Sequence, residues 1–448
     1  MTKQILSLCY CLFTIALIHG QSITWDGKVS ALGLFSSEET NPFWMYANTN
    51  TQVGARSQFS GLGEIKGNYA LSENASLEAG LALFFRDEVE DEFQRRDLYL
   101  QFKNNWLKAT IGAQRQEVQA QGLSATNKNF LWSGNARPLG GLIVEANEPL
   151  KVSESFSLDW GIGHYQLNDD RFVEDVRVHY KRLGLIVKFN EKHAVKAQIQ
   201  HYAQWAGTSP VFGDLPNDFD AFVDVFFAKS APEINVEGEI LNAVGNHLGS
   251  YLFDYSFEAS PGEFSIYHEH PFEDGSGTGF SNFPDGVWGI HFKPNSKKVF
   301  TGLLYEYIDT TDQSASEVSG VDNYFRNSVY RSGWSYEGNI IGMPFILIDN
   351  SVVVNENNSP IISNRERVHH FGLMGTVKKI DWTLKSTIVS HLGSFVNPFE
   401  TTLNLWHNYA SFTYATDSYG TFTLHIGVDS GELIETNFGA GLEYSYSF

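Results

Sequence analysis

The sequence predicts an all-β fold, a transmembrane antiparallel β-barrel with long extracellular loops. Three observations predict it: an N-terminal export signal, sustained alternation of apolar and polar residues, and a final strand that ends on an aromatic residue. A barrel of this kind belongs to the outer membrane of Gram-negative bacteria.

The export signal occupies the first residues of the chain. Lys3 supplies a positive charge, and residues 5–18 form an uncharged, apolar run of 14 residues. This run is too short to span a bilayer and is typical of a secretory signal. We expect cleavage near Gly20, which leaves residues 21–448 as a single barrel domain. Neither Cys9 nor Cys11 follows a small residue, so no lipid anchor is predicted.

Both cysteines of the chain lie inside this signal. The mature protein therefore has none, which excludes disulfides, thiol chemistry and cysteine-ligated metals. A long exported chain without disulfides must be held together by its own backbone pairing or core. A closed barrel satisfies that requirement.

Composition and charge fit the same fold. No stretch approaches the ~20 apolar residues that a spanning helix needs, and the mean hydropathy of −0.23 is what alternating lipid-facing and lumen-facing residues give. Aromatic residues make up 14% of the chain, which suits the aromatic girdles of a barrel. The formal net charge of −21 argues against nucleic acid as a partner.

The alternation has the period of two that a barrel wall requires. Odd positions in 77–86 are apolar, 195–200 alternates without a slip, and 421–428 does the same. Such segments put one set of side chains on the lipid face and the other in the lumen.

The strands are expected to form hairpins with short turns at one end of the barrel. Short polar turns are predicted at 104–106, 190–193 and 378–381, and the turns at Asn105 and Asn190 are natural periplasmic ones. The longer connections are predicted at 38–55, 117–139, 207–217, 270–285, 309–323 and 340–364. Counting the alternating segments gives roughly 16 to 20 strands, within the range of large barrels.

The C-terminal segment 441–448 alternates throughout and stops at Phe448. A soluble sandwich can also end in this way. Together with the export signal and the sustained alternation, the segment favours a barrel.

Several segments fit neither a simple strand nor a turn. They combine aromatic residues, arginine and small hydrogen-bonding residues, and they are 41–48, 130–138, 201–210, 268–277 and 324–334. They resemble the hallmarks of the Wzi-type capsule assembly family, in its Bacteroidetes-like branch. The matching segments are Pro-Phe-Trp at 42–44, Trp-Ser-Gly-Asn-Ala-Arg-Pro at 132–138, Gln-Trp-Ala-Gly-Thr-Ser-Pro at 204–210, Phe-Glu-Asp-Gly-Ser-Gly at 272–277, Tyr-Arg-Ser-Gly-Trp at 330–334 and Ile-Gly-Met-Pro at 341–344.

The resemblance implies an outer-membrane lectin, and it favours 18 strands with loops that partly fill the lumen. Members of this family associate capsular polysaccharide or exopolysaccharide with the cell surface and organise it there. The expected partners are therefore such a polysaccharide, outer-membrane lipid and, during insertion, the barrel-assembly machinery; no cofactor is expected. The best-characterised branch also carries a periplasmic helical bundle, for which no sufficiently long amphipathic segment is evident here.

Trp and Tyr faces stack on sugar rings, and Arg, Asn and Asp bind hydroxyls and carboxylates. The candidate glycan-binding residues on this basis are Trp132, Asn135, Arg137, Trp205, Asp274, Arg331 and Trp334.

Each aromatic candidate also has a packing interpretation. For Trp132 and Arg137 it is a loop folded into the lumen, with Arg137 paired to a carboxylate of the wall. Trp44 is expected in plug packing or interfacial anchoring rather than in sugar stacking, and Trp205 in an aromatic girdle. For Trp334 with Arg331, packing and glycan contact are equally supported.

Catalytic and metal-binding signals are weak. His268 and His270 project to one face of a strand and Glu269 to the other, without an evident third metal ligand. A turn at 274–277 and the stretch 168–170 are weaker calcium hypotheses. No Gly-x-Ser-x-Gly elbow, His-Glu-x-x-His or phosphate-binding loop is present, so no enzyme is predicted. The alternatives are a porin for small solutes and, less favoured, a lipid-active barrel enzyme.

Overall fold

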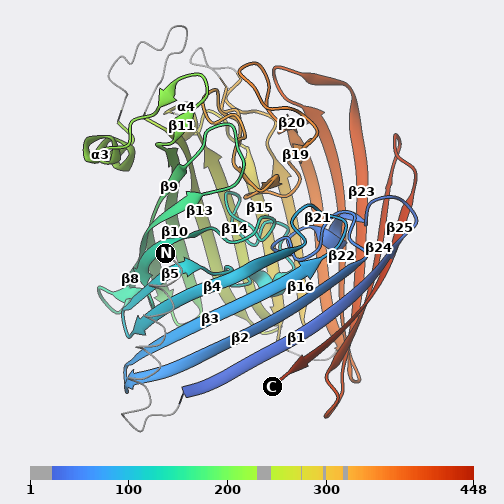
Figure 1. Cartoon of the computed structure of the whole chain (residues 1–448). Coiled ribbons are helices and arrows are strands. Elements are labelled where there is room, and N and C mark those ends of the chain that lie inside the picture. Colours follow the sequence, from blue (N-terminus) through green and yellow to red (C-terminus); the bar gives the residue numbers. More distant parts are fainter. Residues whose placement is uncertain (1–22, 230–243, 274, 296–298, 316–320) are drawn as a thin grey trace, which may run out of the picture.

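The computed structural model describes residues 23–229, 244–273, 275–295, 299–315 and 321–448. These residues form one closed, antiparallel β-barrel whose loops fold over and into one end (Figure 1). The export signal at 1–20 lies outside the described residues, so it stays a prediction.

The wall strands are between 7 and 18 residues long, as expected for tilted membrane-spanning strands. Their bounds are β1 Ile23–Ser36, β2 Phe59–Ser72, β3 Ala75–Arg86, β4 Phe93–Asn104, β5 Leu107–Ala113, β6 Gly140–Ala146, β8 Phe156–Leu167, β9 Val176–Asn190, β10 His193–Trp205, β13 Asn246–Ala259, β14 Gly262–Phe272, β15 Gly286–Pro294, β16 Gly302–Asp309, β21 Glu366–Val377, β22 Ile380–Gly393, β23 Pro398–Ala415, β24 Thr421–Gly431 and β25 Asn437–Ser447.

The first and last strands close the barrel. β1 pairs with β2 on one side and with β25 on the other, and Val29 lies opposite Tyr446. The two-residue strand β7 (Leu150–Lys151) pairs with β8 beyond the end of β6, so the 19-stranded sheet makes a wall of 18 strands in the described residues. The expectation of a large barrel with 18 strands is confirmed.

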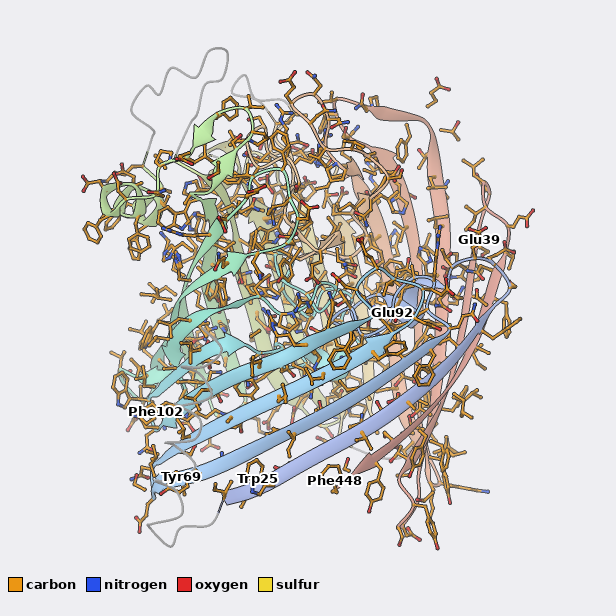
Figure 2. All side chains as sticks on the ribbon, in the orientation of Figure 1. Trp25, Glu39, Tyr69, Glu92, Phe102 and Phe448 are labelled. Carbon is orange, nitrogen blue, oxygen red and sulfur yellow. The ribbon has the colours of Figure 1, made fainter. Side chains whose placement is uncertain are left out.

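Side chains alternate between the lumen and the outer face as the sequence predicts. In β10, Tyr202 and Gln204 point inward and contact loops in the lumen, whereas Ile199 is exposed on the outer face. At the short-turn end the outer face carries aromatic residues, among them Trp25 and Tyr69 (Figure 2). This arrangement matches the aromatic girdle of a membrane barrel.

The short turns fall at the end of the barrel where β1 begins and β25 ends (Figure 1). The turns after Asn104 and Asn190 are confirmed, since β5 begins at Leu107 and β10 at His193. The turn predicted at 378–381 is shorter than expected, because Ile380 and Asp381 already pair with the neighbouring strand. This end corresponds to the periplasmic side.

The opposite end carries the long loops, which we name by their order around the barrel. Those used below are L1 (37–58), L3 (114–139), L4 (168–175), L5 (206–245), L6 (273–285) and L7 (310–365). The largest hydrophobic cluster lies inside the barrel and joins L1, L3 and L7 to inward-facing residues of the wall. We call the parts of L1, L3 and L7 that occupy the lumen the plug.

The loops contain short regular elements. Their bounds are α2 Phe43–Tyr46, η1 Ala120–Gly122, β11 Thr208–Ser209, β12 Gly213–Asp214, α3 Phe219–Phe227, α4 Gly275–Thr278, β17 Ser335–Tyr336, β18 Asn339–Ile340, β19 Leu347–Ile348 and β20 Ile361–Ser363. Among the described residues, no helix has the length and apolar character needed to cross a membrane.

Candidate functional site

L3 and L7 meet inside the barrel, and this contact brings together the motifs at 132–138 and 330–344. The backbone N–H of Ser133 donates to the carbonyl of Ile341 at 2.9 Å, and its hydroxyl donates to Gly342 at 2.8 Å. The N–H of Met343 donates to the carbonyl of Phe130 at 2.9 Å. Two segments about 200 residues apart in the chain therefore form one backbone-bonded layer of the plug.

Two tryptophans fix this layer to the wall. Trp334 has 0% of its surface exposed, and its indole N–H donates to the carbonyl of Leu131 at 2.6 Å. Trp132 is also buried, and its ring packs edge-on against Tyr165 of β8 and tilted against Tyr202 of β10. In this structure both rings are packing groups. Their contact with a glycan stays a prediction, which would require the plug to open.

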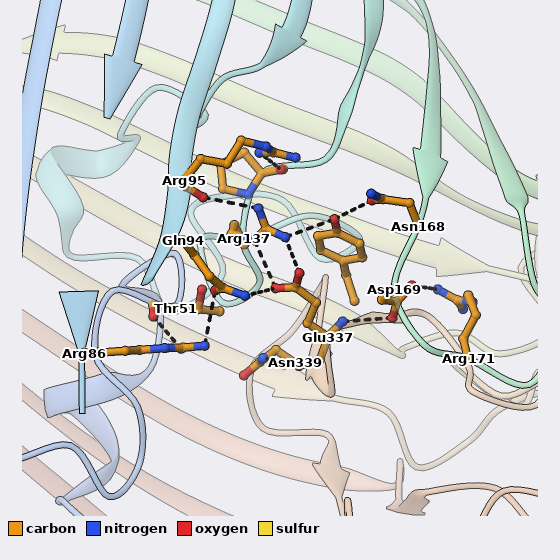
Figure 3. A network of polar contacts seen from close by, with 12 residues as sticks. Thr51, Arg86, Gln94, Arg95, Arg137, Asn168, Asp169, Arg171, Glu337 and Asn339 are labelled. Atoms are coloured by element: carbon orange, nitrogen blue, oxygen red, sulfur yellow. Dashed lines mark hydrogen bonds and ion pairs between the residues drawn. The ribbon is translucent and has the colours of Figure 1, made fainter. Parts of the chain in front are cut away.

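Arg137 of L3 and Glu337 of L7 form the central ion pair of the plug (Figure 3). Nε of Arg137 donates to Oε2 of Glu337 at 2.9 Å, and its Nη2 donates to Oε1. Burial acts to lower the pKa of Arg137, but the hydrogen bond and charge of Glu337 outweigh it and raise the pKa. A packing role with a carboxylate from the wall was expected for Arg137. The carboxylate comes from L7 instead, because the two loops pack face to face.

Two arginines of the wall lie beside this pair (Figure 3). Arg86 ends β3 and donates to the carbonyl of Thr51 in L1 at 2.5 Å. Arg95, near the start of β4, donates to the carbonyl of Pro138 at 3.2 Å. Both guanidinium groups also interact electrostatically with Glu337, so three arginines share this carboxylate. Guanidinium donors in this number can bind carboxylate or hydroxyl oxygens of a polar ligand.

L4 ties the same segment of L7 to the wall from the other side. Arg171 donates to the carbonyls of Gly333 and Ser335 at 3.1 Å each, and Asp169 accepts from the backbone N–H of Glu337 at 2.9 Å. Burial lowers the pKa of Arg171, and its ion pair with Asp169 at 3.1 Å opposes that shift. L7 is therefore fixed on both flanks of Trp334.

L6 holds the beginning of L7 through one carboxylate. Asp285 accepts from the backbone N–H groups of Asp312 at 3.0 Å and Gln313 at 2.8 Å, and from the hydroxyl of Tyr324 at 3.0 Å. Burial raises the pKa of Asp285 to about 7, although these hydrogen bonds act in the opposite direction.

L1 completes the plug against the opposite wall. The indole N–H of Trp44 in α2 donates to the hydroxyl of Thr387 in β22 at 2.9 Å, and the ammonium of Lys385 lies 4.6 Å from the centre of its ring. Phe43 stacks on Phe345 of L7 with ring centres 5.3 Å apart. Of the two packing roles expected for Trp44, the structure shows plug packing.

Trp205 lies on the outer face of the barrel, at its long-loop end. Its indole is buried beneath α3, where Phe222 lies 5.7 Å away, and the guanidinium of Arg177 lies over the ring. The prediction that Trp205 is a girdle residue is correct about the outer face of the barrel. It is wrong about contact with lipid, because α3 covers the ring.

The remaining candidates are dispersed. Asn135 is half-buried in the plug and donates to the carbonyl of Ile340 at 3.0 Å. Arg331 is half-buried in L7, and its charge, together with burial, lowers the pKa of the neighbouring Arg326. Asp274 lies outside the described residues, and so does that part of the calcium hypothesis.

His268 and His270 share one face of β14 and Glu269 lies on the other, as predicted; the histidines face outward, and Glu269 faces the plug and accepts from the N–H of Phe130 at 2.8 Å. The two imidazoles are stacked on aromatic rings of the outer face, His268 on Trp288 with ring centres 3.7 Å apart. In the ranges that the structure describes, no group of three or more His, Cys, Asp or Glu residues is arranged to hold a metal ion.

Four residues of the site were not predicted from the sequence: Arg86, Arg95, Asp169 and Glu337. Glu337 stands three residues beyond a predicted motif, but its partner is 200 residues away, and no periodic signal connects them. Helix α3 was also missed. Its only local signals are Asp218, which caps it, and four phenylalanines at 219–227.

Comparisons with known proteins agree with this architecture. The family model described as capsule assembly protein Wzi matches residues 22–345. A search of curated proteins finds no match.

Among solved structures, the chain resembles Wzi of Escherichia coli with a TM-score of 0.59 and 12% identity, over 93% of this chain and 83% of that one. It also resembles OccK3 of Pseudomonas aeruginosa, with a TM-score of 0.53 and 10% identity over 95% and 96% of the two chains. At such identities the structural likeness supports the fold alone. The match of the family model over most of the sequence shows that the chain belongs to the Wzi family of capsule assembly proteins.

Proposed function

We propose that this outer-membrane barrel binds a capsular or other exported polysaccharide at its extracellular face and keeps it attached to the cell. Membership of the capsule assembly family supports the proposal. So does the resemblance to E. coli Wzi, which is described as a carbohydrate-binding β-barrel involved in group 1 capsule assembly.

The observation that carries the proposal is the plug itself. L1, L3 and L7 are joined to one another and to the wall on opposite sides, at Tyr202 of β10 and Thr387 of β22. The plug therefore reaches across the lumen from one side of the wall to the other. Glu337, 20% exposed, and the half-buried Asn135 lie in the plug, and the half-buried Arg95 of β4 lies beside it. Their hydrogen-bonding groups suit a glycan.

A porin remains the alternative function. OccK3 of P. aeruginosa shares the barrel architecture, but a shared fold alone does not establish a shared function. The filled lumen favours binding over conduction. The difference is measurable, since a porin requires a continuous aqueous path.

The proposed role is binding without catalysis. Outer-membrane lipid surrounds the apolar outer face, and the barrel-assembly machinery is proposed to act on the terminal strand β25 before it closes on β1. Neither partner alters the site on the plug.

The test is a deletion of the gene followed by measurement of polysaccharide in the cell-attached and released fractions. The proposal expects that polymer is still made but moves to the medium, and that the wild-type gene restores attachment. Unchanged attachment in the deletion strain would contradict it.

A second comparison locates the binding surface. Complementation with Arg95→Gln and Arg331→Gln together should restore attachment only partly, because two half-buried cations near the exposed face are removed. The matched control is Arg56→Gln, an arginine of L1 whose side chain is 64% exposed and pairs with Glu39. Equal attachment in both variants would place the glycan elsewhere on the extracellular face.

A further inference from the structure

A second polar site lies on the outside of the barrel, not on the plug. Gln166 of β8 lies directly opposite Arg177 of β9, which lies directly opposite Trp205 of β10. Their neighbours Leu167 and Val176 belong to the core inside the lumen. Because side chains alternate along a strand, the row of Gln166, Arg177 and Trp205 faces outward.

The level of this row relative to the membrane follows from β9. From Phe189 at the periplasmic end, the outward residues Val187, Leu185 and Leu183 are apolar, and Lys181 is the first charged one. Eight residues separate Phe189 from Lys181, about 27 Å along a strand. At a strand tilt of about 40° this is roughly 20 Å of height, close to the apolar band of about 25 Å. The outer membrane surface therefore lies near Lys181, and Arg177 lies just above it.

Helix α3 covers the wall at this level (Figure 1). Phe222 packs on His179 with ring centres 5.3 Å apart, and Val225 is buried against the wall. The ammonium of Lys181 donates to the carbonyl of Phe226, near the end of the helix. The other side of the helix exposes Phe219 by 75% and Phe227 by 66%. Exposed phenylalanines on the outer wall, where the apolar band ends, are typical of a helix in the membrane interface.

Beside α3 the wall forms a cavity of about 330 Å³, lined by Gln166, Asp175, Arg177, Ala206, Gly207, Thr208 and Asn217. Its side chains offer an amide, a carboxylate, a guanidinium and a hydroxyl, so donors and acceptors are both present and the two charges balance. The guanidinium of Arg177 lies 5.2 Å from the centre of the Trp205 ring. The cavity lies within the size range of small-ligand sites. This mixture suits the hydroxyls of a sugar ring.

We propose that this cavity binds a sugar of the glycolipid headgroups that form the outer leaflet, while α3 anchors the barrel beside it. The site lies on the outer wall just above the membrane surface, so the ligand closest to it is the saccharide of a surrounding lipid rather than the polymer above the plug. Gln166, Arg177 and Thr208 bind its hydroxyls. The proposal goes beyond polysaccharide attachment, since it assigns a second glycan contact on a separate face of the molecule.

The test uses the purified full chain in detergent with two probes, de-acylated core oligosaccharide of lipopolysaccharide and capsular polysaccharide. Binding of each is measured by titration calorimetry for wild type, for Arg177→Gln combined with Gln166→Ala, and for Gln166→Ala alone. Arg56→Gln is the control, because it removes an exposed arginine far from α3 in sequence. Heat-modifiable gel mobility checks that each variant is a folded barrel.

The double variant loses the hydrogen bonds of the Arg177 guanidinium and of the Gln166 amide. We therefore expect it to bind the core oligosaccharide about tenfold more weakly than wild type does. Gln166→Ala alone should weaken it less, and polysaccharide binding should stay unchanged. The proposal is overturned if the wild type does not bind the core oligosaccharide, or if the folded double variant binds it as well as wild type does. It is equally overturned if polysaccharide binding is lost instead, which would assign the cavity to the polymer. If wild type binds the core oligosaccharide but not the capsular polysaccharide, the result counts against the proposed function and not against this site.

Discussion

The wall and the plug of this barrel are stabilised in different ways. In the wall, β21 and β22 pair continuously from Glu366–His391 to Val377–Ile380 through backbone hydrogen bonds. In the plug, individual side chains accept hydrogen bonds from backbone N–H groups that a neighbouring strand would satisfy in the wall. The side-chain oxygen Oδ1 of Asn129 accepts from the backbone N–H groups of Leu131 and Trp132 at 3.1 and 3.0 Å.

L7 repeats this device at Asn327, whose side chain accepts from the N–H groups of Val329 and Tyr330 at 2.9 and 3.0 Å. Asparagine is favoured at such turns because its side chain can replace a backbone acceptor. We therefore expect the wall to tolerate substitutions at most positions and the plug to depend on individual side chains.

The largest effect is expected for Trp334→Ala. Removal of a fully buried indole leaves a cavity and an unpaired carbonyl at Leu131, at a cost of about 3–5 kcal/mol to the closed plug. Limited proteolysis should cut L3 and L7 faster, while heat-modifiable mobility of the barrel persists. If protease resistance of L3 and L7 and the heat-modifiable mobility of the barrel are lost together, the plug and the wall do not unfold independently.

The ion pair of Arg137 and Glu337 should have the next largest effect. Each single alanine variant leaves a partly buried charge without its partner, which costs the L3–L7 contact about 2 kcal/mol. The double variant should lose less than the sum of the two. Hydrogen exchange of residues 133–137 measures the effect in the two single variants and in the double variant. Strictly additive effects would mean that Arg137 and Glu337 are not energetically coupled.

Asp285 should make the contact between L6 and L7 depend on pH. Burial raises its pKa from 3.8 to about 7, so the stability of the closed L7 falls as pH rises from about 4 to about 7 and is constant above that range. The protection factors of the amides at 312–313, which correct for the base-catalysed rise of intrinsic exchange with pH, should therefore be higher at pH 5 than at pH 8. Asp285→Asn, which carries no charge, should remove this dependence; an unchanged pH profile in that variant would assign it to another group.

The smallest effect is expected in the wall. Leu183 is exposed on the lipid-facing side of β9, so Leu183→Ala removes little packing and should change stability by no more than about 0.5 kcal/mol. Protease resistance of L3 and L7 should equal that of wild type. Faster cleavage of the plug in this variant would break the distinction between the two regions.

The wall could be predicted from the sequence because its signals are local. Alternation at 195–200 and the turn after Asn190 each lie within a few residues, and the paired strands follow directly. The exception was the turn near Ile380, where strand pairing begins two residues earlier than the polar sequence indicated.

The plug could be predicted only in part. The motif around Trp132 and Arg137 marked the loop as unusual. The packing interpretation correctly placed this loop in the lumen of the barrel. The partner of Arg137 is Glu337, and neither periodicity nor spacing relates positions 200 residues apart. Trp205 shows the same limit on the outer face, because the helix that covers it could not be located from the strand pattern.

Planar-bilayer conductance of the purified protein tests the central claim, that a fixed plug converts a large barrel into a closed binding platform. We expect wild type to show no large, stable conductance, whereas Trp334→Ala combined with Glu337→Ala should show frequent openings as the plug loosens. Large and stable conductance in wild type would contradict the account and favour a porin.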